Sequence, residues 1–343
     1  MRNVDYKYEV LRNHVPIAEI HAVGTPVVRH QSEAVIPRTL KGVFAYDVGA
    51  VNWFTDRIRP SIIIDGVSYP LGVYVVSTAS ESYRNGISVW DIQAMDQTLL
   101  LKQTALENVL HYDEGSAYYA AITGLLSEAG VKVVLGDASE DVMSTAREDW
   151  EIGDTYLTVI NALLSEIGFD SVWFDSEGIA RMTRYVAPNA SNIKHTYKTD
   201  SMSVIESACT VERDIYNPYN VFMALVSNTE LLLPLRAVAV NDDPVSPIST
   251  IALGRRIMAP VEKLNNIASL AALQAHVERR KEESKLTNEI VKFTTANMPG
   301  HEHRDVIALA HERVQGIYLE TEWEMQLSYN GKMTHKARRM ILS

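Results

Sequence analysis

Apolar and polar residues alternate through most of the first hundred positions, which is the pattern of β-strands with one buried face. Asp65-Gly66 separates two apolar runs within Pro60–Val67, and an Asx-Gly pair in that setting predicts a hairpin turn. Asn85-Gly86 predicts a second turn, after which residues 87–92 resume the alternation. Two such turns in close succession predict a meander or a small barrel.

The periodicity changes near Leu99 and becomes helical in two places. A helix is predicted for Ser116–Ala129, with Gly130 at its end and a short strand at Val131–Leu135. A second helix is predicted to begin at an Asp154 cap and to end at Gly168. Its apolar stripe consists of Leu157, Ile160, Leu164 and Ile167.

A further hairpin is predicted where Asp175-Ser-Glu-Gly178 separates two strand-like runs, 169–174 and 179–185. Beyond it, the pattern is mixed. Strands are predicted at Val221–Val226, Leu231–Val240, Ile290–Phe293 and Val314–Leu327, and a proline-containing loop at Asp242–Ser249. Asn266–Lys285 is the clearest helix, with a narrow stripe of Ile267, Leu270, Leu273 and Val277 and a charged, solvated end that includes Glu278, Arg279, Glu282 and Glu283.

This order predicts an α+β protein that is mainly β. A length of 343 residues is too great for one ordinary core. We expect a first β-rich domain at 1–100, a small α/β domain at 101–190, and a second β-rich domain at 191–343. An accessory insertion around 228–287 would contain the long helix.

Composition narrows the classes of function. The formal net charge of −11 argues against nucleic-acid binding and against an anionic membrane surface. Cys209 is the single cysteine, so neither an intrachain disulfide nor a cysteine-based zinc site is possible, and we interpret it as a small core residue. The apolar runs are too short to cross a bilayer, and the N-terminus lacks the apolar stretch of a signal peptide, which predicts synthesis and folding in the cytoplasm.

The most ligand-like cluster is His301-Glu302-His303-Arg304-Asp305, because histidine and carboxylate side chains bind zinc or harder cations. Alternate residues on an extended segment do not reproduce the one-face spacing of a helical zinc motif. The segment also follows the turn Met298-Pro-Gly300, so we interpret it as a solvated loop that leads into a strand at Val306–Leu309.

Other polar clusters are interpreted as surface or structural features. Asp242-Asp243 and Asp137–Asp141 lack the spacing of a calcium loop and are assigned to surface loops. The five tryptophans are scattered, which favours core or interface anchors over a sugar-binding cluster: Trp53, Trp90, Trp150, Trp173 and Trp323. No serine-hydrolase elbow, phosphate-binding loop, dinucleotide fingerprint or helical zinc motif occurs. We therefore assign no catalytic, cofactor-binding or metal-binding residues.

The chain resembles the tail proteins of tailed phages that are related to the baseplate hub, the trimeric ring below the tail tube. The resemblance runs through nearly the whole chain and rests on the order of several stretches. They are Val51–Pro60, Tyr69–Tyr74, Val89–Leu100, Thr158–Leu164 with Asp175–Gly178, and Asp243–Thr250 with Gly254-Arg255.

The resemblance implies two tube-type β-barrel or sandwich domains with the α/β domain between them. Three copies would give six tube domains in a homotrimeric, pseudo-sixfold ring that mates with the tail tube. The implied role is structural and not enzymatic, in the virion tail tip, during genome ejection. The implied partners are the tail tube or distal tail protein, the tape measure protein, and tip fibre or receptor-binding proteins. DNA would pass through the lumen without specific binding, no cofactor would be needed, and no membrane insertion is expected.

Two other functions remain open at this stage. One is a tail-associated cell-wall hydrolase acting through His301, His303 and Asp305. The other is a glycan-binding or receptor-binding module, for which an aromatic content of 8% offers little support. The basic segment Lys336–Arg339 is interpreted as a solvated end rather than a docking site for an acidic partner.

Overall fold

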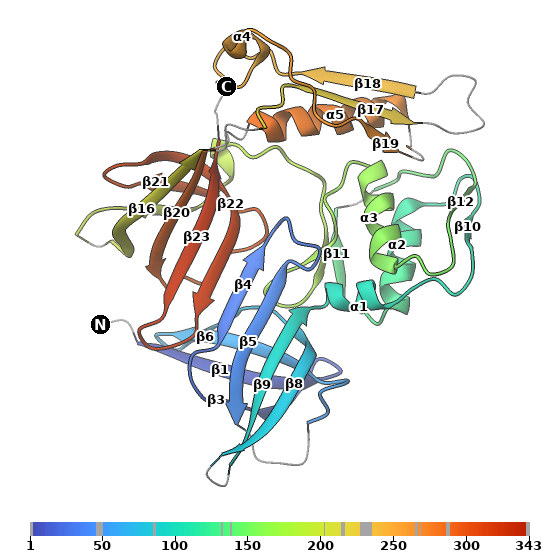
Figure 1. Cartoon of the computed structure of the whole chain (residues 1–343). Coiled ribbons are helices and arrows are strands. Elements are labelled where there is room, and N and C mark those ends of the chain that lie inside the picture. Colours follow the sequence, from blue (N-terminus) through green and yellow to red (C-terminus); the bar gives the residue numbers. More distant parts are fainter. Residues whose placement is uncertain are drawn as a thin grey trace.

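The computed structural model describes residues 3–45, 51–84, 87–131, 133–137, 139–201, 203–213, 217–226, 235–264, 267, 269–285 and 289–340. Most strands in these ranges belong to one 15-stranded sheet that includes both the N-terminal and the C-terminal strands. Figure 1 shows the N-terminal strands below, the C-terminal strands to the left, the helices within residues 98–166 to the right, and a smaller sheet with the helix Leu270–Lys285 across the top. No helix in the described ranges combines the length and apolar composition needed to cross a membrane.

The N-terminal strands, here called the first β unit, pair in a circuit. Asp65 and Gly66 have φ of 49° and 85° and form the predicted turn between β6 and β7. β8 and β9 form the second predicted hairpin, although Asn85 and Gly86 lie outside the described residues. Strand pairing leads from β1 to β6, β8, β9 and β5 in turn. At the ends of this path β3 pairs with β5 and β2 pairs with β1, and the chain between β2 and β3 brings the path back toward β1. The strands are β1 (Val4–Arg12), β2 (Val15–Glu19), β3 (His21–Ala22), β4 (Val27–Gln31), β5 (Arg38–Ala45), β6 (Arg57–Ile64), β7 (Val67–Pro70), β8 (Tyr74–Arg84) and β9 (Ile87–Asp96).

The α/β unit follows and has its own hydrophobic core, to which both predicted helices contribute. Gly130 and Gly168, with φ of 82° and 75°, end these helices as expected. The prediction of Asp154 as the N-cap of the second helix is wrong, because the N-cap is the next residue, Thr155. Thr155 has an extended backbone and accepts from Thr158 N at 3.3 Å, whereas the Asp154 side chain accepts from the backbone of the preceding turn. The elements are α1 (Thr98–Gln103), β10 (Leu110–Tyr112), α2 (Tyr118–Glu128), β11 (Val134–Gly136), β12 (Arg147–Trp150), α3 (Tyr156–Glu166), β13 (Trp173–Phe174) and β14 (Ala180–Met182).

The C-terminal strands, the second β unit, extend the large sheet through the pairing of β22 with β4. The interpretation of Lys336–Arg339 as a solvated end is wrong, because these residues belong to β23, which pairs with β20 and β22. Arg338 and Arg339 form ion pairs with Glu33 and Glu289 at 2.8 and 2.9 Å. The elements are η1 (Ala190–Asn192), β15 (Ile193–Lys198), β16 (Ile205–Arg213), β20 (Glu289–Ala296), β21 (Val306–Ala310), β22 (Gln315–Gln326) and β23 (Lys332–Arg339).

A small insertion separates β16 from β20. Its strands follow the order β18-β17-β19, and α5 covers one face. Leu273 and Val277 of the predicted helical stripe are buried, but Leu270, the residue at which the helix begins, is exposed. The predicted loop at 242–249 is confirmed, and residues 231–234 lie outside the described ranges. The elements are β17 (Val221–Val226), β18 (Leu235–Val240), α4 (Thr250–Leu253), β19 (Glu262–Leu264) and α5 (Leu270–Lys285).

The core of the first β unit is completed by side chains from the C-terminal strands. Trp323, Met325 and Met333 pack in one cluster with Val10 and Leu40. The two ends of the chain are therefore fastened together both by backbone pairing and by apolar burial. Cys209 is partly buried against the core of the second β unit. The prediction of a mainly β protein is confirmed.

Candidate functional site: a histidine-rich junction

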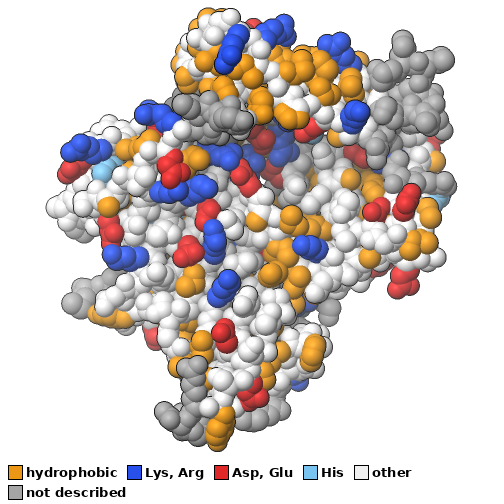
Figure 2. Space-filling view, viewed as in Figure 1, with side chains coloured by type: hydrophobic (Ala, Val, Ile, Leu, Met, Phe, Trp, Pro, Cys, Tyr) orange, Lys and Arg blue, Asp and Glu red, His pale blue; other side chains and the backbone are white. Residues whose placement is uncertain are grey.

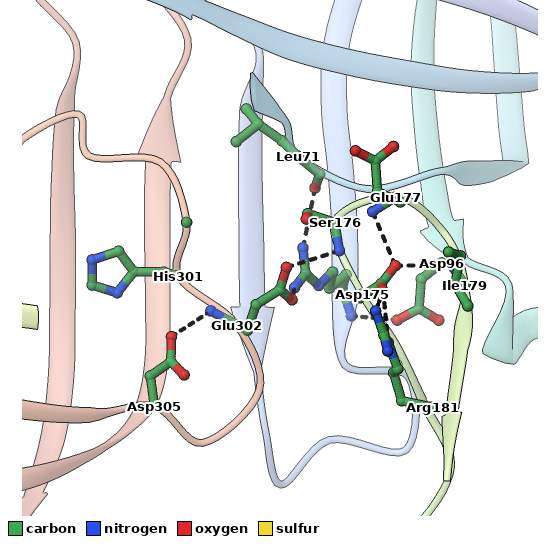
Figure 3. A network of polar contacts seen from close by, with 12 residues as sticks. Leu71, Asp96, Asp175, Ser176, Glu177, Ile179, Arg181, His301, Glu302 and Asp305 are labelled. Atoms are coloured by element: carbon green, nitrogen blue, oxygen red, sulfur yellow. Dashed lines mark hydrogen bonds and ion pairs between the residues drawn. The ribbon is translucent and has the colours of Figure 1, made fainter. Parts of the chain in front are cut away.

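Residues 301–305, which we call the junction segment, lie in the loop between β20 and β21 where all parts of the chain meet. Figure 3 shows His301 and Glu302 pointing away from each other, with Glu302 directed at Ser176. The loop turns at Gly300 and Arg304, whose φ values are 89° and 58°. The prediction of a loop before β21 is confirmed, but its description as solvated is wrong. His301 is only 3% exposed, because the segment is enclosed between the sheet and the α/β unit.

His301 belongs to a buried hydrogen-bonded network inside the second β unit. Its Nδ1 lies 2.6 Å from one carboxylate oxygen of Glu320, and Nδ1 of His335 lies 2.6 Å from the other. Nε2 of His301 lies 2.6 Å from the hydroxyl of Tyr197, and Nε2 of His335 lies 2.9 Å from Thr295 Oγ1. Burial alone would raise the pKa of Glu320, but the two histidines lower it to about 2, so the carboxylate is charged and accepts from both rings.

The distances in this network fit hydrogen bonds better than ligation of a metal ion. His301, Glu320 and His335 place their ligand atoms close together, as do His195, His301 and Asp305. Ligands about 2.0–2.2 Å from one tetrahedral ion lie roughly 3.3 Å apart, so a 2.6 Å contact brings them too close. The rings of His195 and His301 are stacked at 3.8 Å, nearly parallel, so their in-plane lone pairs run side by side and do not converge.

The structure does not gather His301, His303 and Asp305 around one reaction centre. His303 stacks on Trp173 at 5.3 Å between ring centroids and meets His30 edge-on at 5.5 Å. Asp305 accepts from the backbone N of the junction segment itself at 2.8 Å and lies 3.5 Å from His195 Nε2. His301 and Asp305 therefore share the neighbourhood of His195, but His303 points to a separate aromatic environment.

Glu302 connects the second β unit to the first through a buried arginine. Arg38, 1% exposed, forms an ion pair with Glu302 and donates to the carbonyl of Leu71 at 3.3 Å. Its guanidinium also lies 5.6 Å from the centre of the Trp323 ring. Burial tends to lower the pKa of Arg38, but Glu302 and other nearby acidic groups raise it overall, so the cation is retained. The backbone N of Arg38 donates to Asp96 at 2.9 Å.

The predicted hairpin at Asp175–Gly178 brings the α/β unit to the same point. Ser176 N donates to the second oxygen of Glu302 at 3.0 Å (Figure 3). Asp175 shapes the turn by accepting from the backbone N atoms of residues 177 and 179. Gly178 has φ of 78°, and a Cβ there would lie 2.6 Å from Val73, so glycine permits the close approach of the first β unit.

The insertion is attached by the charged end of α5, which the sequence interpretation wrongly assigned to solvent. Arg279 donates to Asp170 at 2.5 Å and to the carbonyl of Phe169 at 3.1 Å, and it lies 4.1 Å from the centre of the Tyr185 ring. Arg304 donates to Glu283 of the same helix at 3.2 Å. The junction segment thus contacts every unit of the chain, and its chemistry is that of a structural clamp.

The acidic stretches singled out in the sequence lie away from the junction. Asp137, Asp141 and Asp242 are exposed, as expected of surface loops. Asp243 is half-buried, accepts from Val245 N at 2.9 Å and lies 3.5 Å from Lys285. None of these contacts involves the junction segment.

Sequence reasoning missed Arg38, Glu320 and His335. Arg38 lies 264 residues from Glu302 in sequence, Glu320 lies 19 from His301 and His335 lies 15 from Glu320, so no motif-like spacing relates them. One signal was present: Glu320 is a charge within a β-rich run that the sequence assigns to a strand. A charge in such a strand is either on an edge or paired in the interior.

We expect Glu320→Gln to lower the free energy of unfolding by about 2–3 kcal/mol near pH 7, because it removes the charge that accepts from two buried rings. The matched control is Glu322→Gln on the same strand, whose Arg29 partner is 41% exposed, and it should cost less than about 1 kcal/mol. Because the pKa of Glu320 is lowered, its stabilisation is present above the unfolded pKa and is lost as pH falls from about 4.5 toward 2. Urea unfolding that finds both variants equally stable would contradict the network.

Comparisons with solved structures identify the class of fold. No protein-family model matches the sequence, and no curated protein matches it. The tail protein from Neisseria meningitidis MC58 superposes with a TM-score of 0.68 at 15% identity, covering 97% of this chain and 96% of that one. The 43 kDa tail protein of prophage MuSo2 from Shewanella oneidensis has a TM-score of 0.66 at 10% identity, with 97% and 98% covered. Prophage tail protein gp18 from Listeria monocytogenes EGD-e has a TM-score of 0.58 at 9% identity, with 96% and 94% covered.

These likenesses extend over nearly the full length of both chains in each pair. The chain has the fold of phage tail proteins. Within that class its fold is of the baseplate-hub type, as the sequence resemblance implied.

Proposed function

We propose that this chain is a structural subunit of the tail tip of a tailed phage, in which three copies form a ring at the distal end of the tail tube. The observation that supports it is the agreement of fold with phage tail proteins over almost the whole length of both chains. The first and second β units then serve as two tube domains per copy. Six such domains make a pseudo-sixfold surface on which a sixfold tube would sit.

Within this proposal the domain boundaries fall where the hydrophobic clusters change. The α/β domain would occupy about 101–190, and the insertion that the sequence places around 228–287 would begin earlier, at β17, and interrupt the second tube domain. Each region contributes its own buried cluster. The junction segment would then hold the two tube domains at one fixed angle, which a closed ring requires of every copy.

The free edges of the large sheet support assembly between copies. The strand path runs from β16 at one end to β2 at the other, and the outer edge of each pairs with no strand among the described residues. β2 carries Val15 and Ile17, which are 60% and 38% exposed. An exposed apolar edge strand is a liability in a monomer and an assembly site in a ring.

The role we propose is structural and not catalytic, in the virion tail, after synthesis in the host cytoplasm. The ring would bind the tail tube or distal tail protein on one side and tip or tape measure proteins on the other. The genome would pass through its lumen without sequence-specific contact, which suits a chain with a net charge of −11.

Sedimentation velocity and electron microscopy of the purified chain test this proposal. We expect a concentration-dependent trimer and class averages that show a ring with threefold symmetry and a central hole. Ile17→Lys on the β2 edge should shift the equilibrium toward monomer, whereas Val35→Lys, at an exposed position outside the strands, should not. A chain that stays monomeric at high concentration, with no ring in the presence of tail-tube protein, would refute the hub assignment.

A further inference from the structure

α5 covers one face of the insertion sheet, whereas the opposite face is only partly covered: Val221 there is 1% exposed and Met223 is half-buried. α5 packs on the side formed by Ala224, Val226, Ala237 and Ala239. Because successive side chains of a strand point to opposite faces, the intervening residues point away from the helix. The register of β17 with β18 places Met223 opposite Val238 on that side. We call this side the outer face of the insertion.

Apolar side chains dominate the outer face. Met258 and Val261 are 50% and 39% exposed, and the strand residues beside them are half-buried. Figure 2 shows hydrophobic side chains gathered over the insertion, at the top of the view. The apolar members are Met223, Leu225, Val238, Val240, Met258 and Val261. A contiguous apolar surface on a small sheet marks an interaction site more often than a free surface.

Four cations that form no ion pair with a described residue border this apolar surface. Arg236 lies opposite Leu225 in the pairing of β17 with β18, and Lys263 lies opposite Leu225 in the pairing with β19. Arg255 and Arg256 follow α4 at the other end of the sheet. All four side chains are exposed, and none forms an ion pair with a residue that the structure describes. Such a group attracts an acidic partner, and two copies that met through this same surface would bring like charges together.

The outer edge of β18 is open as well. β18 pairs with β17 on one side, and its other side has no strand neighbour among the described residues. The strand contains neither proline nor lysine, the residues that commonly protect an edge. An extended segment can therefore add to β18 through backbone hydrogen bonds and lay alternate side chains on the outer face.

We propose that the outer face of the insertion and the free edge of β18 bind an extended segment of another protein in which apolar and acidic residues alternate. The apolar residues would cover Met223 and Val238, and the acidic residues would pair with Arg236 and Lys263. The added strand would make the insertion a four-stranded sheet. This surface is separate from the edges assigned to ring assembly, so its test does not depend on the ring.

A fluorescent peptide of alternating valine and glutamate is the probe, and its binding to the full-length chain is measured by fluorescence anisotropy. A valine–lysine peptide of equal length tests charge selection. The same valine–glutamate peptide with alternate backbone nitrogens methylated keeps its side chains but loses the donors needed for strand addition. We expect the acidic peptide to bind, the basic peptide not to bind, and methylation to weaken binding about tenfold or more.

Two charge-reversal variants of the chain complete the experiment. Arg236→Glu with Lys263→Glu should weaken binding about tenfold or more, whereas Lys41→Glu with Lys102→Glu, at exposed positions elsewhere, should change it less than about twofold. Hydrogen exchange should slow at β18 amides when the acidic peptide is bound. Equal binding of both peptides, or no loss in the first variant, overturns the proposal. The proposal would also be overturned if the chain self-associates and Val238→Asp abolishes that self-association. The occupant of the outer face would then be a second copy of this chain.

Discussion

Arg38→Ala should lower the free energy of unfolding by about 3–5 kcal/mol, because it leaves the Glu302 carboxylate without its cation at a largely enclosed site. The side chain is 1% exposed, so a cavity against Trp323 would add to the loss. The expected defect is the separation of the two β units, since Glu302 and Arg38 belong to different ones. Urea unfolding followed by tryptophan fluorescence measures it, because Trp323 lies beside the guanidinium.

The matched control for this prediction is Arg29→Ala. Arg29 also belongs to the first β unit and also pairs with a glutamate of the second, but its side chain is 41% exposed. Removing the Arg29 side chain should lower the free energy of unfolding by less than about 1 kcal/mol. The double variant Arg38→Met with Glu302→Met should recover part of the stability, because neither charge is then left alone. If Arg38→Ala lowered the free energy of unfolding no more than Arg29→Ala does, the ion pair between Arg38 and Glu302 would contribute little to stability.

Local sequence patterns predicted those parts of the fold that local physics determines. The Asp65-Gly66 turn, the two helices of the α/β unit and the Asp175–Gly178 hairpin each depend on neighbours within a few residues, such as a glycine with positive φ or an apolar stripe. The cap at Thr155 rather than Asp154 shows the limit of this reasoning. Both residue types cap helices well, and the backbone geometry at 155 decides between them.

Long-range partners explain why the junction was misread. A run of histidine, glutamate, arginine and aspartate after a turn has the composition of a solvated loop, and burial depends on strands far away in the chain. His301 is buried because β22 and β23 bring Glu320 and His335 to it. The basic segment at Lys336–Arg339 was misread for the same reason, since its ion-pair partners, Glu33 and Glu289, come from other parts of the sheet.

The junction also suggests why so many ionisable groups are buried at one place. An apolar contact between two β units tolerates small changes of angle, whereas an ion pair with fixed donors and acceptors does not. Arg38, Glu302 and Ser176 define one arrangement of three units. If the proposed ring forms, each copy must present its two tube domains at the same angle, and such a polar clamp supplies that uniformity at some cost in stability.

The free energy of unfolding should fall steeply as pH decreases from 7 to 5. Burial lowers the pKa of His30 well below its usual value, and burial likewise lowers the pKa of His335 and brings the pKa of His303 to about 3. These rings stay neutral in the folded chain but gain a proton near pH 6.5 when unfolded. The unfolded state therefore binds more protons below that pH, and His30 and His303 each cost about 2 kcal/mol at pH 5. His195 acts in the opposite direction: burial would lower its pKa, but Asp305 raises it overall.

His30→Phe isolates one of these contributions, because His30 is 1% exposed and neither ring nitrogen has a hydrogen-bond partner among the described residues. Phenylalanine keeps a flat ring beside Trp323, where the imidazole now stacks at 5.7 Å, and it cannot take up a proton. Between pH 7 and pH 5 the free energy of unfolding of this variant should fall by about 2 kcal/mol less than that of the parent chain. His21→Gln, which replaces an exposed histidine of the same β unit, is the matched control. Parallel pH profiles for the parent chain and His30→Phe would mean that His30 titrates alike in the folded and unfolded states, because only a difference in proton binding between them makes stability depend on pH.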